Sequence, residues 1–159
     1  MDLTKLFELQ KALDDRIIDE KGLEGQDLYR MKVMALQVEL AELAQEIGDV
    51  WKFWKEGDCR DTVRVLEELV DCLHFLISIG IDAGVKPAER RGKLKALTTF
   101  DQLEGCFRYF PICYVSNQWE TAFAYFWGLT EMLGFDWEDV EAAYIQKNEI
   151  NHHRQAAGY

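Results

Sequence analysis

The fold is decided by ELAELAQEIGDVWKFWK (residues 39–55) and LEELVDCLHFLISIGI (residues 66–81). In both segments hydrophobic residues recur at steps of three and four, which is the spacing of an amphipathic helix. The chain has only two prolines in 159 residues. Its runs of Leu, Ala, Glu, Lys and Gln favour helix, and segments typical of strands are hard to find. The sequence therefore predicts an all-α helical bundle.

Hydrophobic periodicity and helix-breaking residues divide the chain into six expected helices. The second and third should form an antiparallel hairpin around a turn at Gly57 and Asp58, and Asp136 is placed to cap the last helix. We expect one domain over residues 1–159, in which residues 149–159 form a mobile C-terminal tail that is either disordered or binds substrate. The expected helices cover residues 2–19, 27–56, 59–83, 100–107, 116–133 and 137–148.

Charge and cysteine content limit the classes of partner. The formal net charge of −11 repels polyanions, which argues against a nucleic-acid-binding protein. The hydrophobic run at residues 73–83 is too short for a membrane span and is interrupted by polar residues. The four cysteines form no Cys-x-x-Cys pair, so they are expected to be reduced thiols. We therefore expect a soluble cytoplasmic protein that binds neither nucleic acid nor membrane.

Two pairs of acidic residues on the expected hairpin are candidate metal ligands. Glu39 and Glu42 lie three residues apart, about 60° around a helix axis, and Glu68 and Asp71 repeat this spacing on the next helix. The midpoint between the pairs falls close to Gly57, so the pairs should lie level across the hairpin. One such pair alone is typical of a solvated helix face. Four carboxylates close together, with few basic residues among their sequence neighbours, indicate a hard divalent cation such as Mg²⁺, whose coordination is completed by water and phosphate oxygens.

These segments, the aromatic run at residues 51–54 and the C-terminal KNEINHHRQAAGY (residues 147–159) resemble the dimeric dUTPases of the all-α nucleotide pyrophosphatase, or MazG-like, superfamily. The resemblance extends to the opening LFELQKALDDRI at residues 6–17 and leaves residues 86–135 without a recognisable motif. It implies a homodimeric dUTP diphosphatase that hydrolyses dUTP, and also dUDP, with two or three magnesium ions in each site.

The resemblance and the acidic pairs together define the expected site. The expected magnesium ligands are Glu39, Glu42, Glu68 and Asp71, and Glu39 or Glu42 can also accept the proton of the attacking water. His74 is expected to be a structural histidine. The residues expected to bind the nucleotide are Gln10, Lys52, Trp54, Lys147, Asn151, Arg154 and Tyr159.

Two alternatives stay open at this point. A dCTPase-like or MazG-like pyrophosphatase would share the acidic pairs but act on another nucleotide, and the C-terminal segment argues against it. A non-catalytic helical bundle would need no metal ligands at all, and the presence of all four acids argues against that.

Overall fold

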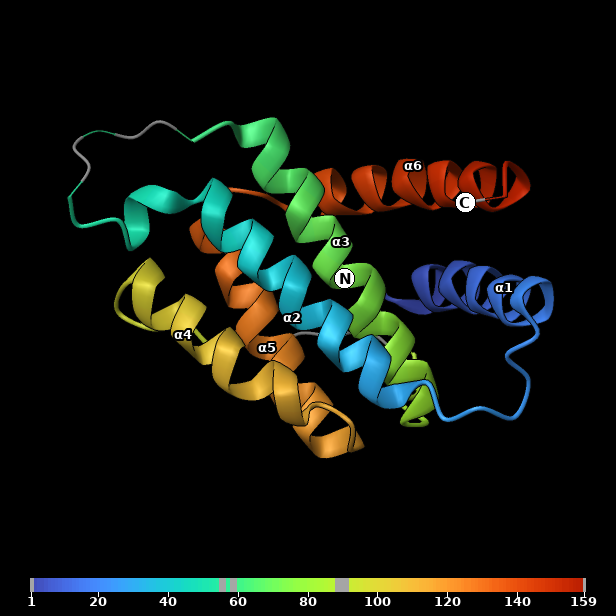
Figure 1. Cartoon of the computed structure of the whole chain (residues 1–159). Helices are drawn as coiled ribbons and strands as arrows, with labels where there is room; N and C mark the ends of the chain where they lie inside the picture. The colour runs from blue at the N-terminus through green and yellow to red at the C-terminus, as the bar shows by residue number, and fades with distance from the viewer. Residues whose placement is uncertain (1, 55–56, 58–59, 88–91, 159) are drawn as a thin grey trace.

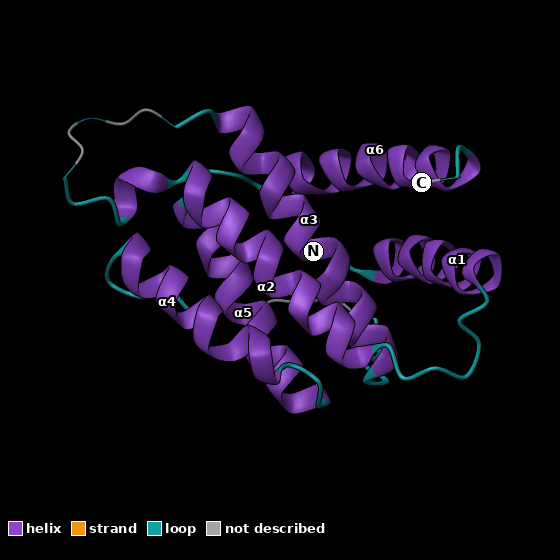
Figure 2. Cartoon of the chain, in the orientation of Figure 1, coloured by secondary structure: helices purple, strands orange, loops and turns teal. Residues whose placement is uncertain are grey.

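The computed structural model describes residues 2–54, 57, 60–87 and 92–158. The regular structure in these ranges is helical (Figures 1 and 2), which confirms the predicted all-α fold. The helices are α1 (Thr4–Lys21), α2 (Tyr29–Glu46), α3 (Thr62–Asp82), α4 (Thr99–Tyr109), α5 (Ser116–Met132) and α6 (Trp137–Ala156), with short 3₁₀ helices η1 (Gly48–Val50) and η2 (Phe110–Ile112).

The antiparallel pair of α2 and α3 forms the centre of the bundle (Figure 1). Leu40 and Leu43 of α2 and Leu69 and Leu73 of α3 are completely buried between the helices. On one side of this hairpin α1 and α6 pack against α3 and against each other, and on the other side α4 and α5 form a second pair. None of the helices in the described part of the chain combines the length and apolar character needed to cross a membrane.

Helix α2 ends at Glu46, earlier than the expected boundary at residue 56. Gly48 is a poor helix former, and the chain tightens there into the 3₁₀ helix η1. The indole Nε1 of Trp51 then donates a hydrogen bond of 2.6 Å to the carbonyl oxygen of Ala44, which satisfies one of the orphan carbonyls at the helix end. The prediction of a continuous helix was wrong because this side-chain cap is a tertiary feature. Residues 55–56 of the expected helix lie outside the described residues.

Helix α3 begins at Thr62, where the Asp61 side chain accepts hydrogen bonds from the backbone N–H groups of Val63 and Arg64. This cap fixes the start of the helix slightly after the expected position at residue 59, which is outside the described residues. Further along, Gly80 lets α5 approach closely, because a Cβ atom there would lie 2.7 Å from Nε1 of Trp119. That indole donates a hydrogen bond of 2.6 Å to the carbonyl oxygen of Leu76.

Helix α6 continues to Ala156, eight residues beyond the expected end at Asn148. It starts with the predicted Asp136 cap, which Asp139 completes as a capping box. No glycine or proline interrupts the helix, and its later turns lie against α1, where Nη1 of Arg16 donates a hydrogen bond of 3.0 Å to the His152 carbonyl oxygen. Residues 149–156 are thus helical rather than an irregular tail, and Tyr159 lies outside the described residues.

Candidate active site

The hairpin brings three of the four predicted metal ligands together. Glu39 and Glu42 on α2 and Glu68 on α3 each offer a carboxylate oxygen, and these oxygens lie within 4.8 Å of one another. Glu39 and Glu68 are half-buried, whereas Glu42 is exposed. The level placement of the acidic pairs follows from the spacing of three residues on each helix and from the antiparallel packing of α2 on α3.

The carboxylate cluster is electrostatically unfavourable on its own. Burial, followed by repulsion from Asp71, Glu42 and Glu68, raises the pKa of Glu39 to about 7. Burial and the neighbouring acids also raise the pKa of Glu68. A divalent cation would relieve this repulsion, and three carboxylates without cysteine or histidine form the oxygen ligand set that Mg²⁺ prefers. The residues present therefore fit magnesium.

Asp71 has a different neighbour. Its Oδ2 atom accepts a hydrogen bond of 2.5 Å from Nζ of Lys147 on α6, and it is not one of the three clustered acids. Burial raises the pKa of Asp71, and the ammonium group of Lys147 partly offsets this effect. Glu46 is also paired, with Arg64 at 3.0 Å. Few cations are close to the acids in sequence, but α6 brings Lys147 across 76 residues of chain.

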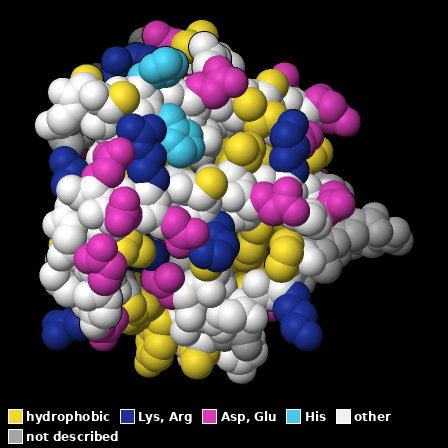
Figure 3. Space-filling model, turned by 90° about the vertical axis from the view of Figure 1, so that its right-hand side faces the viewer, with side chains coloured by type: hydrophobic (Ala, Val, Ile, Leu, Met, Phe, Trp, Pro, Cys, Tyr) yellow, Lys and Arg dark blue, Asp and Glu magenta, His cyan; other side chains and the backbone are white. Residues whose placement is uncertain are grey.

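A cavity of about 530 Å³ opens beside the carboxylate cluster, between α1, α2, α3 and α6. This volume lies in the range of small-molecule binding sites. Glu39 and Asp71 line the cavity near the acids, and Gln10, Asn151 and Arg154, three of the predicted nucleotide-binding residues, belong to the same wall. Figure 3 shows the side of the molecule where α1 and α6 end, and there basic and histidine side chains lie among acidic ones.

A buried hydrogen-bond network holds Gln10 in this wall. The Tyr144 hydroxyl donates a bond of 2.6 Å to Oε1 of Gln10, and Nδ1 of His74 lies 2.8 Å from the same oxygen. Nε2 of Gln10 donates a bond of 2.8 Å to Asp14. The rings of His74 and Tyr144 stack at 3.9 Å. His74 is thus held by side chains, as a structural histidine would be, but it also lines the cavity together with Asp14 and Ser78. The sequence analysis missed these cavity roles, although the spacing of four residues between Gln10 and Asp14 places them on one helix face.

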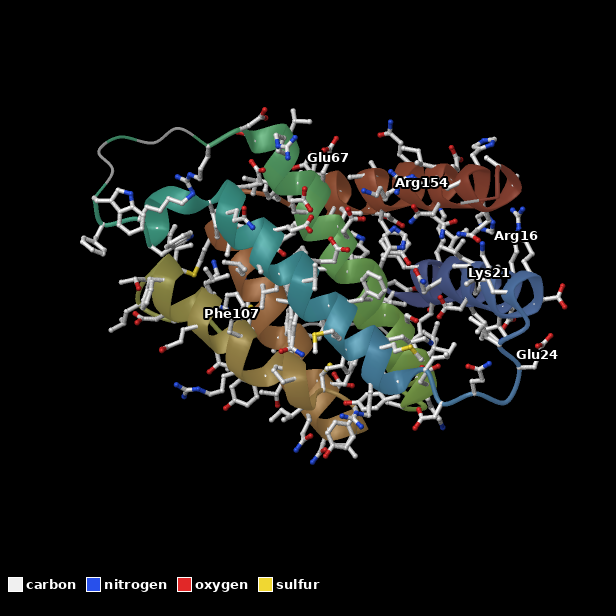
Figure 4. The ribbon with its side chains drawn as sticks, viewed as in Figure 1. Arg16, Lys21, Glu24, Glu67, Phe107 and Arg154 are labelled. Carbon is white, nitrogen blue, oxygen red and sulfur yellow. The ribbon has the colours of Figure 1, made fainter. Side chains whose placement is uncertain are left out.

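Lys52 and Trp54 lie on another side of the molecule. Nζ of Lys52 is 4.9 Å from the centre of the Trp51 ring, and Trp54 is 61% exposed. Lys52 lines a separate groove of about 600 Å³ between the end of α2 and α4, together with Phe100 and Phe107. Figure 4 shows Phe107 and Arg154 on opposite sides of the α2–α3 hairpin. Neither Lys52 nor Trp54 is among the residues that line the cavity of its own chain.

The described helices thus form an all-α bundle in which acidic side chains and a lysine meet beside an open cavity, an arrangement that fits an enzyme acting on phosphorylated small molecules. The match is more specific: a family model described as dUTPase covers residues 2–159, so the chain belongs to the dUTPase family. This confirms the resemblance to the dimeric all-α dUTPases and identifies the chain as an enzyme, a dUTP diphosphatase.

The family match includes residues 86–135, in which no motif was recognised from the sequence. Searches of curated proteins and of solved structures gave no match. The function is therefore inferred from family membership and from the geometry of the site.

Proposed function

We propose that the enzyme hydrolyses dUTP to dUMP and pyrophosphate, that it also accepts dUDP, and that it requires Mg²⁺. The proposal rests mainly on one observation: the Glu39, Glu42 and Glu68 cluster borders the cavity that contains Gln10 and Asn151. Acids suited to a cation–polyphosphate complex thus lie next to amides suited to a base. Such a combination serves a nucleotide better than a free phosphate or a nucleoside.

Each polar residue near the cluster has a role in this reaction. Bound Mg²⁺ supplies positive charge that orients phosphate oxygens and makes water more acidic. Glu39 or Glu42 accepts the proton of the attacking water. Lys147 and Arg154 neutralise the negative charge that develops on the leaving phosphates. Asn151 contacts the nucleotide from the same face of α6, because residues 147, 151 and 154 follow helical steps of four and three.

We propose Asp71 as the fourth metal ligand, in a site that holds two or three ions. Lys147 shields the Asp71 carboxylate at 2.5 Å. Cation binding by Asp71 would release the ammonium group of Lys147 for a phosphate oxygen. Residues 149–156, the end of α6, would then contact the phosphates through Arg154.

A homodimer is the proposed assembly, because a second apolar surface is left without cover. Phe53 is 93% exposed, and Trp54, Phe100 and Phe107 are also exposed beside the groove between α2 and α4. Monomeric proteins rarely expose aromatic side chains together in this way, and two-fold dimers are the commonest assembly. In a dimer, Lys52 and Trp54 could serve the cavity of the partner subunit. Cys72, Cys106 and Cys113 are free and buried, which supports the proposed cytoplasmic location.

The test of the proposed function is the release of nucleoside monophosphate from dUTP, dUDP, dCTP, dTTP and ATP, with Mg²⁺ and with a chelator. We expect selective formation of dUMP that requires Mg²⁺, and pyrophosphate as the second product from dUTP in ³¹P NMR spectra. Preferential hydrolysis of another nucleotide would contradict the proposed base preference. Equal activity in the presence of the chelator would contradict the metal site.

A further inference from the structure

The carboxylate of Asp14 determines which way the Gln10 amide points. Its Oδ2 atom accepts a hydrogen bond of 2.5 Å from the Ser78 hydroxyl and lies 3.4 Å from Nζ of Lys32. Its Oδ1 atom lies 2.8 Å from the Gln10 amide. A carboxylate held between a hydroxyl and an ammonium group only accepts hydrogen bonds. The NH₂ end of Gln10 must therefore face Asp14, and its carbonyl oxygen must face the other way.

This orientation in turn determines the tautomer of His74. The Gln10 carbonyl oxygen accepts from the Tyr144 hydroxyl and faces Nδ1 of His74 at 2.8 Å, so that Nδ1 must carry a hydrogen. Burial, followed by the charge of Lys147, lowers the pKa of His74 to about 3, an effect that the backbone of Tyr144 offsets only in part. The ring is thus neutral near pH 7. A neutral imidazole has one N–H, which leaves Nε2 as an acceptor.

Nε2 of His74 is the unusual atom of this network. It is buried, yet it has no hydrogen-bond partner within the part of the chain that the structure describes. An unpaired buried acceptor is costly, and His74 lines the cavity. The Gln10 amide has a second N–H besides the one that Asp14 accepts. Gln10 and His74 both line the cavity, so its wall can offer one acceptor and one donor.

We propose that Asp14 is a positioning residue which, through Gln10, fixes the His74 tautomer so that the cavity selects uracil over cytosine. The inference rests on the proposed dUTP specificity. Nε2 of His74 accepts the N3–H of uracil, and the second N–H of Gln10 donates to the adjacent carbonyl oxygen. Cytosine presents a lone pair at N3 and an amino group beside it. With cytosine, the acceptor N3 would face the acceptor Nε2 of His74, and the donor amino group would face the donor N–H of Gln10. Polar sites strongly reject ligands that leave their buried groups unpaired in this way.

The first test is the ¹⁵N spectrum of the full chain labelled at histidine, recorded with dUMP and with dCMP. The expected result is a neutral His74 with its proton on Nδ1, and an upfield shift of the Nε2 signal with dUMP but not with dCMP. A His74 proton on Nε2, or the same response to both nucleotides, would overturn the inference. These spectra of the unaltered protein decide the question even where a variant fails to fold.

The second test compares Asp14→Asn with Asp82→Asn. Asp82 pairs with the same Lys32 at 2.7 Å but does not contact Gln10, so its variant is a matched control. An asparagine at position 14 can donate as well as accept, which frees the Gln10 amide to turn over. We expect the ratio of dUMP to dCMP affinity to fall about tenfold or more in Asp14→Asn, the equivalent of one lost hydrogen bond, with mixed His74 tautomers. Asp82→Asn should keep both properties.

An unchanged tautomer and an unchanged affinity ratio in folded Asp14→Asn would contradict the role of Asp14. One readout is a spectrum and the other a ratio of affinities, so neither depends on turnover. A protein that binds dUMP selectively through Nε2 but does not hydrolyse dUTP would refute the proposed function and leave the inference intact. Hydrolysis of dUTP by a protein with the His74 proton on Nε2 would refute only the inference.

Discussion

Two hollows of similar size flank the α2–α3 hairpin, and they differ in what lines them. The cavity of about 530 Å³ collects polar groups from four helices, whereas the groove of about 600 Å³ is lined mainly by Phe100, Leu103, Phe107 and Trp51. Among the residues that the structure describes, those that line the larger one form no buried polar network and no cluster of acids. Volume therefore does not distinguish a catalytic site from an association surface here. Convergent charges and buried hydrogen bonds are the reason that the cavity, and not the groove, is the proposed site of chemistry.

The largest expected effect is on the cavity side, from Glu42→Gln. This change keeps the size of the side chain but removes one of three clustered charges, and we expect kcat/KM for dUTP to fall by about 100-fold or more. Far-UV circular dichroism should be unchanged, because Glu42 is exposed. Glu67→Gln is the control: Glu67 is an exposed neighbour of the cluster on α3, labelled in Figure 4, and should stay near full activity. Equal losses of kcat/KM in both variants would mean that activity depends on the overall negative charge of this surface rather than on the three clustered carboxylates.

A charge placed in the groove should affect assembly instead. Phe107→Glu would put a carboxylate into the apolar surface, and we expect self-association, measured by light scattering, to weaken by roughly tenfold or more. Val63→Glu adds the same charge at an exposed apolar residue away from the groove and should leave the mass unchanged. A dimer that survives Phe107→Glu would show that the chains associate through a different surface.

Removal of the Tyr144 hydroxyl should have a moderate effect within the cavity. Tyr144→Phe deletes the donor that lies 2.6 Å from the Gln10 carbonyl oxygen. Since Gln10 keeps its bonds to His74 and Asp14, we expect a loss of about 1 kcal/mol in unfolding free energy and a several-fold rise in KM with little change in kcat. Tyr114→Phe, at an exposed position outside the cavity, serves as the control in thermal melts and in kinetics. A fall in kcat alone would contradict a role for this network in base binding.

The smallest expected effect is the pH dependence of stabilisation by magnesium. The pKa of Glu39 is raised from 4.5 to about 7, so the folded metal-free chain keeps a proton that the unfolded chain has lost. This contribution lowers stability as the pH rises through that window. The lowered pKa of His74, which is not a proposed metal ligand, acts in the opposite direction between about 3 and 6.5.

The difference in Tm between Mg²⁺ and chelator therefore isolates the carboxylates. We expect it to grow from about pH 5 to about pH 7.5, because protons compete with the cation for Glu39 and Glu68. Glu39→Gln should flatten this dependence. A difference in Tm that is constant with pH would argue against metal binding by these acids.

The sequence alone determined the helical fold, the hairpin and the acidic pairs, because these depend on periodicity and on spacing within one or two helices. The Asp136 cap was predictable for the same reason. The end of α2 was not, because it depends on the Trp51 indole that reaches back to Ala44. Hydrophobic periodicity predicts where a helix forms. It does not indicate which side chain from the following loop will hydrogen-bond to the free carbonyl groups at the end of that helix.

Only the tertiary structure decided which residues share the cavity. Asp71 and Lys147 are separated by 76 residues, yet they form an ion pair, and Asp71 is not among the three clustered acids. In the same way α1, α3 and α6 had to pack before Gln10, His74 and Tyr144 could meet. Lys52 was separated from Gln10 by the hairpin itself. The spacing of residues along one helix determines which side chains share a face of that helix. Which faces of the four helices meet around the cavity depends on how the helices pack against each other.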